Sequence, residues 1–470
     1  MSDTKKVNNQ KINWSIIQQR QKRRVSETSL SDIRYRKQQL VTFQLMLEEN
    51  QTELLNTLYE DLGKPPEEAY ASEIAVLLQE IDFLKRKLNQ WQRTKKKHHV
   101  RLSSVSKTSI QHHPYGSVLV ISPWNYPLHL ALLPAIGAMA AGNSCFIKPS
   151  EYAPATANLI ARLVEQYFSP DNLMVVTGDA SVASELLELP WDFIFFTGSK
   201  KVGSIVHKAA AARQIPIVLE LGGKNPCIVD ETNLTPTVVQ RIIWGKFLNA
   251  GQTCIAPDTV YLHESVYTEF LQLATDQIKA FYGTQPIHHS RFGRIVHDKQ
   301  VEKLKDYLEQ GKIYYGGQVD TANRFIEPTL LTDIPMDSSI LQEEIFGPIL
   351  PIIPYTDLTT LVHQLKDYPD PLAVYVFSKD KETSQFLKRE LRSGAFSLNQ
   401  VILHAVSSHS PFGGVGASGF GRYHGMASLA TFSYLKMDYE NILPFNSQKQ
   451  YPPYQTNDLN LLRKWRRWLF

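Results

Sequence analysis

Residues 117–122 read SVLVIS, and four similar short apolar runs follow at 144–148 (SCFIK), 173–177 (LMVVT), 193–197 (FIFFT) and 215–221 (IPIVLEL). Helical patterns separate these runs, as at residues 154–168 and 202–212. Short apolar strands that alternate with helices are joined by right-handed crossovers and form a parallel sheet. The alternation therefore predicts an α/β fold that binds a nucleotide, with the ligand at the carboxyl ends of the strands.

The regions on either side extend this pattern over most of the 470 residues. Residues 31–62 and 67–91 carry apolar side chains at three- and four-residue spacing, which predicts two long helices. After Gly223 the alternation resumes, with candidate strands at 225–230, 259–262, 349–354 and 372–378. At roughly 150 residues per domain, the length suggests two or three domains, so we expect a second α/β lobe here.

The composition indicates a soluble globular protein. Hydrophobic residues make up 43% and charged residues 20% of the chain, which is too apolar for a disordered protein. The net charge of +4 is unevenly divided, because residues 1–24 carry +6 and residues 461–470 carry +4. An acidic body with basic ends is not typical of a nucleic-acid-binding domain.

The cysteines and the N-terminus favour a cytoplasmic protein. Cys145, Cys227 and Cys254 show no C-x-x-C spacing, so neither a disulfide scaffold nor a cysteine-based metal site is expected. The polar N-terminus lacks the apolar segment of a secretory signal. Residues 128–141 are strongly apolar but too short to span a membrane, so they are predicted to form a buried helix.

Two glycine-containing segments are candidates for a phosphate-binding loop. Residues 414–419 match G-x-G-x-x-G but lack a strand before them and a helix after them, so we reject them. Residues 198–203 (GSKKVG) follow the run FIFFT and lead into a helix. Gly198 allows a tight exit from the strand, and Ser199 with the first N–H groups of the helix can meet a phosphate. An ordinary strand-to-helix turn is the alternative.

Three residues at the ends of predicted elements supply the functional groups of one candidate site. Cys254 follows a predicted helix, although a free cysteine is more often a small buried apolar residue. Glu220 lies at the end of an apolar strand, where a carboxylate is costly unless it forms an ion pair or has a function. Asn125 follows the first strand, where a simple turn residue would also fit.

Six motifs resemble the NAD(P)-dependent aldehyde dehydrogenase superfamily. In the order of that family, they are PWNYP (123–127), FTGSKKVG (196–203), LELGGK (219–224), GQTC (251–254), EEIFGP (343–348) and PFGG (411–414). Residues 413–425 (GGVGASGFGRYHG) and 399–404 (NQVILH) resemble the class 3 branch, which acts on fatty and aromatic aldehydes. The resemblance implies an α/β fold with a Rossmann-like cofactor lobe, an α/β catalytic lobe and a small bridging element.

The resemblance also implies the reaction, the oxidation of apolar aliphatic or aromatic aldehydes to carboxylic acids. Cys254 would attack the aldehyde, and the site should lower its ordinary pKa of about 8.5 to supply thiolate. The Asn125 amide and the Cys254 backbone N–H would stabilise the oxyanion of the thiohemiacetal. Glu220 would activate the water that hydrolyses the thioester, and burial should raise its pKa.

The implied cofactor is NAD or NADP. By the resemblance, the cofactor contacts are Lys148 and Glu151 at the adenosine ribose, Ser199 at the pyrophosphate, Glu344 and Phe346 at the nicotinamide half, and Trp124, Gly198 and Gly203 around them. For each of these residues a surface or packing role is the alternative. A carboxylate such as Glu151 near the 2′-position favours NAD, whereas Lys200 and Lys201 would offset its repulsion of an NADP phosphate.

The resemblance further predicts the domains and the oligomer. The cofactor domain takes residues 15–95 and 112–221, the catalytic domain 222–420, the bridging element 96–111 and 421–445, and the tail 446–470. The bridging element implies a homodimer, because the chain lacks the longer N-terminus of the tetrameric relatives.

The tail is a candidate membrane contact. Residues 461–470 place leucines and tryptophans on one helical face and arginines and a lysine on the other, which is a membrane-surface pattern. A frayed or docked terminus is the alternative. We therefore expect a cytoplasmic protein, with peripheral membrane contact as a second hypothesis and no nucleic-acid partner.

Two rival functions stay open at the level of the sequence. An acylating enzyme would pass the acyl group to coenzyme A, but an intact Glu220 favours hydrolysis. A catalytically silent structural member is disfavoured by the presence of Cys254, Glu220 and Asn125 together.

Overall fold

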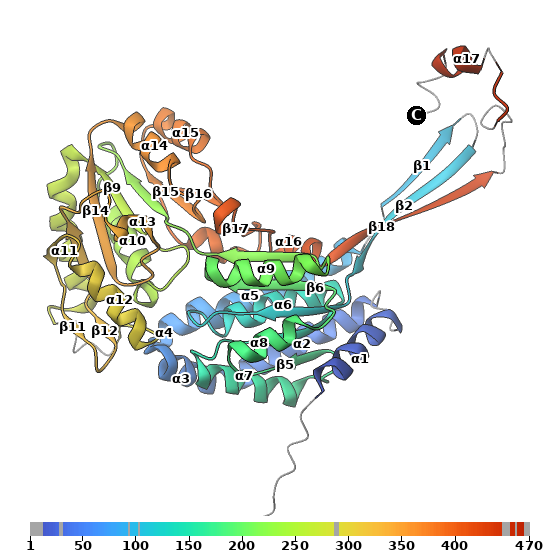
Figure 1. The fold of residues 1–470 in the computed structure, drawn as a ribbon, viewed down its shortest axis with the longest axis horizontal. Coiled ribbons are helices and arrows are strands. Elements are labelled where there is room, and N and C mark those ends of the chain that lie inside the picture. The colour runs from blue at the N-terminus through green and yellow to red at the C-terminus, as the bar shows by residue number, and fades with distance from the viewer. Residues whose placement is uncertain are drawn as a thin grey trace, which may run out of the picture.

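The computed structural model describes residues 13–27, 32–92, 95–101, 104–285, 291–443, 452–455 and 458–464. Two α/β lobes lie side by side, each built on its own sheet, and a narrow three-stranded arm projects from one of them (Figure 1). This arrangement confirms the expected α/β class.

The first lobe contains a six-stranded sheet. Its order is β17 (Gly419–Phe420), β7 (Ile217–Leu221), β6 (Phe193–Gly198), β3 (Ser117–Ile121), β4 (Ser144–Lys148) and β5 (Leu173–Val175). All neighbouring strands are parallel except β17, which runs antiparallel to β7. The chain adds β4 and β5 on one side of β3 and then returns to add β6 and β7 on the other side. Such a reversal opens a crevice at the carboxyl ends of β3 and β6, where ligands bind in open α/β sheets.

Helices cover both faces of this sheet, because successive strand residues point to opposite sides. Val118 and Val120 of β3 belong to one core with α2 (Ile33–Glu49), α5 (Ala75–Trp91), α6 (His129–Ala141) and α7 (Pro154–Tyr167). Leu119 and Ile121 belong to the other core, with α1 (Trp14–Glu27), α8 (Ala180–Leu187) and α9 (Lys200–Ala212). α6 is buried along almost its whole length, as its apolar sequence predicts.

The second lobe contains a seven-stranded sheet. Its order is β10 (Lys312–Tyr315), β13 (Thr329–Thr332), β14 (Ile349–Tyr355), β9 (Thr259–His263), β8 (Pro226–Val229), β15 (Ala373–Phe377) and β16 (Ala395–Leu398). Only β10 is antiparallel to its neighbour. One face packs on α10 (Pro236–Phe247) and α11 (Tyr267–Tyr282), and the other on α14 (Leu358–Lys366) and α15 (Lys381–Glu390).

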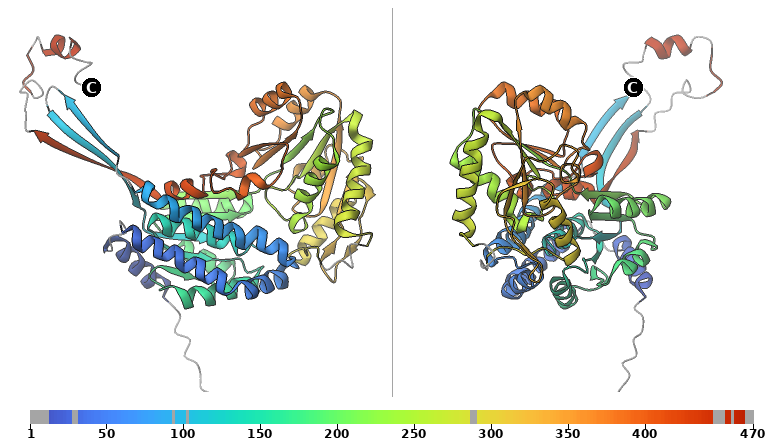
Figure 2. Two further views of the ribbon diagram at one scale, coloured as in Figure 1. Left: turned by 180° about the vertical axis from the view of Figure 1, so that it is seen from behind. Right: turned by 60° about the vertical axis from the view of Figure 1, so that its left-hand side comes forward.

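The arm joins distant parts of the chain. β2 (Ser104–Pro114) lies between β1 (Lys95–Arg101) and β18 (Ser433–Leu443), and both neighbours are antiparallel to it. Further views show the arm extending well clear of both lobes (Figure 2). Leu435 and Met437 of β18 are 63% and 65% exposed.

The N-terminal helices differ from the sequence-based expectation. A single helix over residues 31–62 is wrong, because the backbone leaves helical geometry at Asn50 and divides the segment into α2 and α3 (Gln51–Leu62). The helix expected at 67–91 is continuous but contains a π-helical turn, η1 (Tyr70–Ile74), between α4 (Pro66–Ala69) and α5.

The tail is only partly described. A short helix, α17, spans Asp458–Lys464, and the tryptophans of the expected amphipathic face, Trp465 and Trp468, lie outside the described residues. Within the described ranges, no helix combines the length and the apolar character that a membrane crossing needs.

Candidate active site

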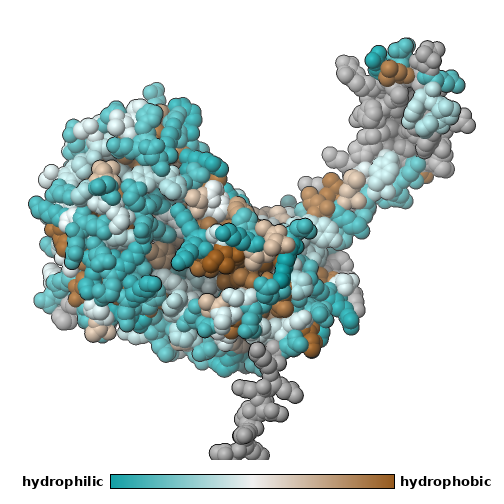
Figure 3. All heavy atoms as spheres, viewed as in Figure 1, coloured by the Kyte–Doolittle hydropathy of each residue, from teal (hydrophilic) through white to brown (hydrophobic). Residues whose placement is uncertain are grey.

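A cavity of about 910 Å³ lies between the two lobes. The residues that line it include Trp124, Asn125, Ser199, Glu220, Cys254, Glu344 and Phe346. Of these, the residues of the first lobe follow or end β3, β6 and β7, as the expected crevice requires, whereas Cys254, Glu344 and Phe346 of the second lobe precede β9 and β14. The cavity therefore lies between carboxyl ends of one sheet and amino ends of the other. Apolar side chains gather around the hollow at the middle of the molecule (Figure 3).

Cys254 reaches this cavity through an irregular backbone. α10 ends at Phe247, and Asn249 and Ala250 then take left-handed φ values of 53° and 52°. The Cys254 carbonyl accepts a hydrogen bond of 2.8 Å from Asn225 Nδ2, which fixes the loop against the second sheet. Cys145 and Cys227 are fully buried in strands, so the packing role expected for them fits their positions.

The Cys254 thiol is not activated by its surroundings in this structure. Burial, together with the nearby carboxyl groups of Glu344 and Glu220, raises its pKa to about 12. The expectation that the site lowers this pKa is therefore wrong, because the thiol faces two carboxyl groups in an apolar cavity. In this structure the thiol form dominates at neutral pH.

Glu220 is a buried carboxyl group without hydrogen-bond partners among the described residues. It is 3% exposed, and neither of its carboxyl oxygens has such a partner. Burial raises its pKa well above the ordinary value, and Arg422 opposes this only in part. A Cβ atom at Gly413 would lie 2.9 Å from Glu220 Oε1, so the carboxyl group packs closely against this glycine.

Asn125 is held at both its backbone and its side chain. Its carbonyl accepts hydrogen bonds from Asn249 Nδ2 at 2.7 Å and from Lys64 Nζ at 3.2 Å. Its Nδ2 donates to the carbonyl of Gln252 at 3.0 Å. Because an amide group carries two N–H bonds, this contact leaves one donor available to the cavity that Asn125 lines.

The candidate phosphate loop caps a helix. Ser199 is the N-cap of α9, and its side chain accepts a hydrogen bond from the N–H of Val202 at 3.4 Å. Neither neighbouring glycine tolerates a side chain, since a Cβ atom would lie 2.7 Å from the Phe196 ring at Gly198 and 2.6 Å from Leu221 at Gly203. Gly198 and Ser199 line the cavity, and Gly203 packs behind them.

Lys148 and Glu151 lie outside the cavity lining, at the end of the neighbouring strand β4. Lys148 Nζ is 3.0 Å from Glu151 Oε2, and the lysine is buried while the carboxylate is partly exposed. The pair thus lies at the end of the strand next to β3, close in sequence to the N-terminus of α7, and only Glu151 is accessible to solvent.

Glu344 and Phe346 close the opposite side of the cavity. Burial and the nearby Asp258 raise the pKa of Glu344 to about 8. A Cβ atom at Gly222 would lie 1.9 Å from Glu344 Oε2, so the carboxyl group occupies the space that this glycine leaves. Phe346 has a left-handed φ of 51° and meets the Trp124 ring edge-on, with 5.4 Å between the ring centres.

The sequence reasoning missed several residues around the cavity. His129 and His424 line it, and burial lowers their pKa values to about 4 and about 3, so both rings are neutral. The Tyr126 hydroxyl lies 2.7 Å from the Thr253 hydroxyl and links the two loops that carry Asn125 and Cys254. The motifs PWNYP and GQTC contain this pair, but only its geometry shows the link.

Comparison with known proteins identifies the family. The model of the aldehyde dehydrogenase family matches residues 9–437. A 4,4'-diapolycopene-4,4'-dial dehydrogenase from Cytobacillus firmus is 48% identical over 91% of this chain and 94% of that protein. A rat dimeric NADP-preferring aldehyde dehydrogenase is 39% identical over 86% and 89% of the two chains. A solved structure of the substrate-bound state of Staphylococcus aureus AldH superposes with a TM-score of 0.92, at 39% identity, over 96% of this chain and 99% of that one.

The chain belongs to the aldehyde dehydrogenase family. The expected fold, the expected oxidation of aldehydes and the expected use of NAD or NADP are confirmed by this membership.

Proposed function

We propose that this enzyme oxidises apolar aldehydes to carboxylic acids with Cys254 as the nucleophile. The observation that carries the proposal is the meeting of three groups on one cavity: the Cys254 thiol, the Asn125 amide and the Glu220 carboxyl group, which has no hydrogen-bond partner in the described part of the chain. Their chemistry matches the three needs of the reaction, which are a nucleophile, an oxyanion donor and a base.

The proposed chemistry begins at Cys254. Because its pKa is raised, attack proceeds through a minor thiolate fraction, and the rate should rise with pH. The remaining N–H of Asn125 and the Cys254 backbone N–H stabilise the resulting oxyanion, and one such donor is worth ~3–4 kcal/mol. Glu220, once ionised, takes a proton from the water that hydrolyses the thioester.

The residues around the cavity fit a dinucleotide. Thr197 Oγ1 and Glu344 Oε1 are buried without partners in the described part of the chain, and both residues line the cavity. The N-terminus of α9, capped by Ser199, offers free N–H groups to a pyrophosphate. When bound, the dinucleotide would supply the hydride acceptor for the carbon that Cys254 has attacked. Phe346 and Trp124 would enclose the nicotinamide half, with Glu344 at its ribose.

The choice between NAD and NADP depends on the edge of the crevice. The ion pair with Lys148 partly neutralises Glu151, which weakens the repulsion of a 2′-phosphate. Lys200 and Lys201 line the cavity and add positive charge nearby. We therefore propose that the enzyme accepts both cofactors, which initial rates at matched concentrations would test.

The substrate side of the cavity is apolar. Its wall includes Leu130, Leu248, Leu372, Ile402 and Phe412. A Staphylococcus aureus relative, 42% identical, is named a 4,4'-diaponeurosporen-aldehyde dehydrogenase, and the Cytobacillus firmus relative is named for a dialdehyde. The test is NAD(P)H formation with a series of aldehydes of rising chain length. We expect kcat/KM to increase with apolar length, and a preference for short polar aldehydes would contradict the proposal.

Hydrolysis is favoured over acyl transfer to coenzyme A, because Glu220 lies on the cavity with no other partner among the described residues. Carboxylic acid should form at the same rate with and without coenzyme A. A product that requires coenzyme A would support the acylating alternative, and no NAD(P)H with any aldehyde would support a silent member.

We also propose three domains: a cofactor domain of residues 15–95 and 112–221, a catalytic domain of residues 222–420, and a bridging element of residues 96–111 and 421–445. The bridging element forms the dimer contact. The exposed apolar residues of β18, Leu435 and Met437, favour burial against a second copy of the chain. Peripheral membrane contact through residues 461–470 is proposed on the charge pattern of the tail alone, and a cytoplasmic location on the three cysteines, which show no C-x-x-C spacing. Sedimentation equilibrium would test the dimer.

A further inference from the structure

We propose that the buried ion pair between Lys64 and Glu73 is a positioning device that holds Asn125 beside Cys254. The inference rests on the proposed function, in which Asn125 is an oxyanion donor. Lys64 and Glu73 do not line the cavity, so they act through the loop and not on the substrate.

The pair is completely enclosed. Both side chains are 0% exposed, and Lys64 Nζ lies 2.5 Å from Glu73 Oε1. Lys64 follows Gly63, the left-handed C-cap of α3, and Glu73 lies in the π-helical turn. Burying two charges costs free energy that their attraction often fails to recover, and an apolar pair of similar volume is often as stable or more so. Stability alone is therefore a weak reason for this pair.

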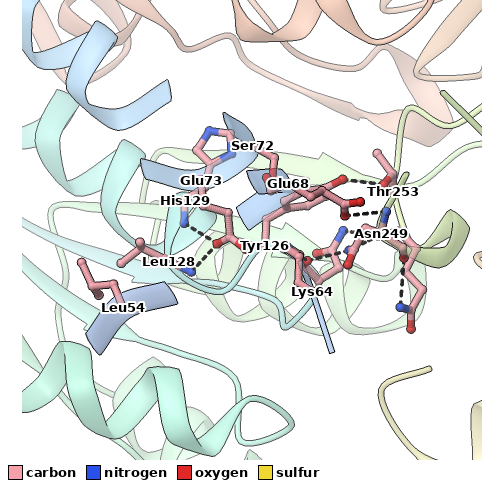
Figure 4. A network of polar contacts seen from close by, with 12 residues as sticks. Leu54, Lys64, Glu68, Ser72, Glu73, Tyr126, Leu128, His129, Asn249 and Thr253 are labelled. Atoms are coloured by element: carbon pink, nitrogen blue, oxygen red, sulfur yellow. Dashed lines mark hydrogen bonds and ion pairs between the residues drawn. The ribbon is translucent and has the colours of Figure 1, made fainter. Parts of the chain in front are cut away.

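The pair holds the loop between β3 and α6 at two points: Lys64 contacts the middle of the loop, and Glu73 contacts its end, beside Leu128 and His129 (Figure 4). Lys64 Nζ donates to the Asn125 carbonyl at 3.2 Å and lies 4.2 Å from the centre of the Tyr126 ring. Glu73 Oε2 accepts hydrogen bonds from the backbone N–H groups of Leu128 at 2.9 Å and His129 at 3.1 Å. At the start of α6 these N–H groups have no carbonyl partner within the helix, so the carboxylate satisfies them. The helix dipole also favours a carboxylate at this position.

The same segment holds the loop that carries Cys254. Glu68 Oε1 accepts a hydrogen bond from the backbone N–H of Asn249 at 2.8 Å. Asn249 Nδ2 in turn donates to the Asn125 carbonyl at 2.7 Å. The Asn125 carbonyl thus receives two donors, one from Lys64 and one from the nucleophile loop, and its position sets the distance between the two loops.

The π-helical turn explains how one short segment reaches both loops. Glu68 and Glu73 are five residues apart, and the 3.6-residue period of an α-helix would point them about 140° apart. In the π-turn the Ala75 N–H bonds to the Tyr70 carbonyl, five residues earlier, which widens the helix and brings such residues towards one face. Figure 4 shows Glu73 beside Leu128 and His129 and Glu68 beside Asn249, with Lys64 and Tyr126 between them.

A double-mutant cycle with Asn125→Ala tests the proposal. Lys64→Met should slow single-turnover NAD(P)H formation by about 10-fold or more, because a 1 Å misplacement of a catalytic group can cost ~10²-fold. The KM for the cofactor should change little, since its site is elsewhere. In the Asn125→Ala background, Lys64→Met should slow the reaction less than 2-fold further, because the group that it positions is gone.

A neutral pair separates positioning from stability. In the double variant Lys64→Met/Glu73→Gln neither member of the pair carries a charge, and the glutamine oxygen still accepts from Leu128 and His129. Its melting temperature should therefore return towards that of the wild type, while the rate stays low because the bond to the Asn125 carbonyl is still missing. This variant also keeps the test usable if Lys64→Met alone does not fold.

Lys22→Met is a matched control. Lys22 Nζ lies 2.9 Å from Asp192, which accepts a hydrogen bond from the Ser117 N–H at the opposite end of β3. The substitution breaks an ion pair that braces the same strand but does not reach Asn125, so the rate should be unchanged.

The outcomes distinguish this proposal from the proposed function. Equal losses from Lys64→Met with and without Asn125→Ala, or recovery of the rate in the neutral double variant, would overturn the positioning role and leave Asn125 as the oxyanion donor. A wild-type rate for Asn125→Ala alone would remove that assignment as well.

Discussion

Replacing Glu220 by glutamine should halt the enzyme after a single turnover. Glutamine has nearly the same shape as glutamate, so it fits the tight space against Gly413. Neither carboxyl oxygen has a hydrogen-bond partner in the described residues, so the substitution breaks no contact that holds the fold. The raised pKa shows that the site already favours an uncharged side chain there, and the variant should be at least as stable as the wild type.

The loss should appear only in the second half of the reaction. Hydride transfer needs Cys254 and Asn125, which are unchanged, so a burst of NAD(P)H of about one equivalent per site should form. Thioester hydrolysis then loses its general base, which is worth ~10²–10⁴-fold, or about 3–5 kcal/mol of activation free energy. Stopped-flow absorbance records the burst, and mass spectrometry of the quenched protein should show an acyl group on Cys254.

The pH dependence gives a second readout. A base acts only when ionised, and burial raises the pKa of Glu220, so hydrolysis in the wild type should speed up as the pH rises. Glu220→Gln should lose this dependence. Glu80→Gln is the matched control, because Glu80 is also buried with a raised pKa but bonds to the Gly425 N–H and does not line the cavity. Wild-type turnover without a burst in Glu220→Gln would refute the reasoning.

Three further predictions concern the cysteines, Glu344 and the tail. Cys254→Ser should abolish NAD(P)H formation, whereas Cys145→Ser and Cys227→Ser should keep it. In the free enzyme, the alkylation of Cys254 by iodoacetamide should still accelerate above pH 9, because the pKa of this thiol is about 12. An alkylation rate that reaches a plateau below pH 8 would contradict this pKa. The pKa of Glu344 is about 8 in the folded protein, above an unfolded value of 4.5, so its contribution to stability is full below about pH 4.5 and is lost as the pH rises through 8. Glu344→Gln should therefore raise the melting temperature at pH 9 but not at pH 4. An equal shift of the melting temperature at both pH values would contradict the direction of this pKa shift. Removal of residues 461–470 should leave turnover of short aldehydes intact and reduce salt-sensitive co-sedimentation with anionic vesicles; equal, negligible binding by both forms would mean an ordinary terminus.

Local patterns in the sequence were sufficient to predict the α/β class and the approximate strands. The alternation of apolar runs and helices between residues 117 and 221 depends only on neighbours along the chain, and the observed strands follow it closely. A ligand at the carboxyl ends of the strands was predictable for the same reason, whereas the place of the crevice between β3 and β6 follows from the order of the strands in the sheet. Cys254, Glu220 and Asn125 were singled out by their positions at element ends, and the structure brings all three to one cavity.

Helix continuity was harder to predict from periodicity. Apolar spacing at residues 31–62 continues through Asn50, where the backbone changes direction because its side chain bonds to the Met46 carbonyl and to the Tyr167 hydroxyl. The π-helical turn at Tyr70–Ile74 is likewise invisible in the spacing of apolar residues. The break at Asn50 depends on one contact within the segment, to Met46, and one outside it, to Tyr167, and neither contact shows in the apolar spacing.

What the sequence determined by itself is the set of elements, their order and the chemical groups at their ends, because these follow from periodicity and residue type. Only the tertiary structure decided the electrostatics and the bracing of the site. The pKa of Cys254 is raised by burial and by Glu344, 90 positions away, so no local pattern reveals it. The Lys64–Glu73 pair meets Asn125, and β17 returns from Gly419 to lie beside Glu220, only because the chain folds back on itself. Charge–charge interaction and desolvation depend on distance in space, which for such residues is unrelated to distance along the sequence.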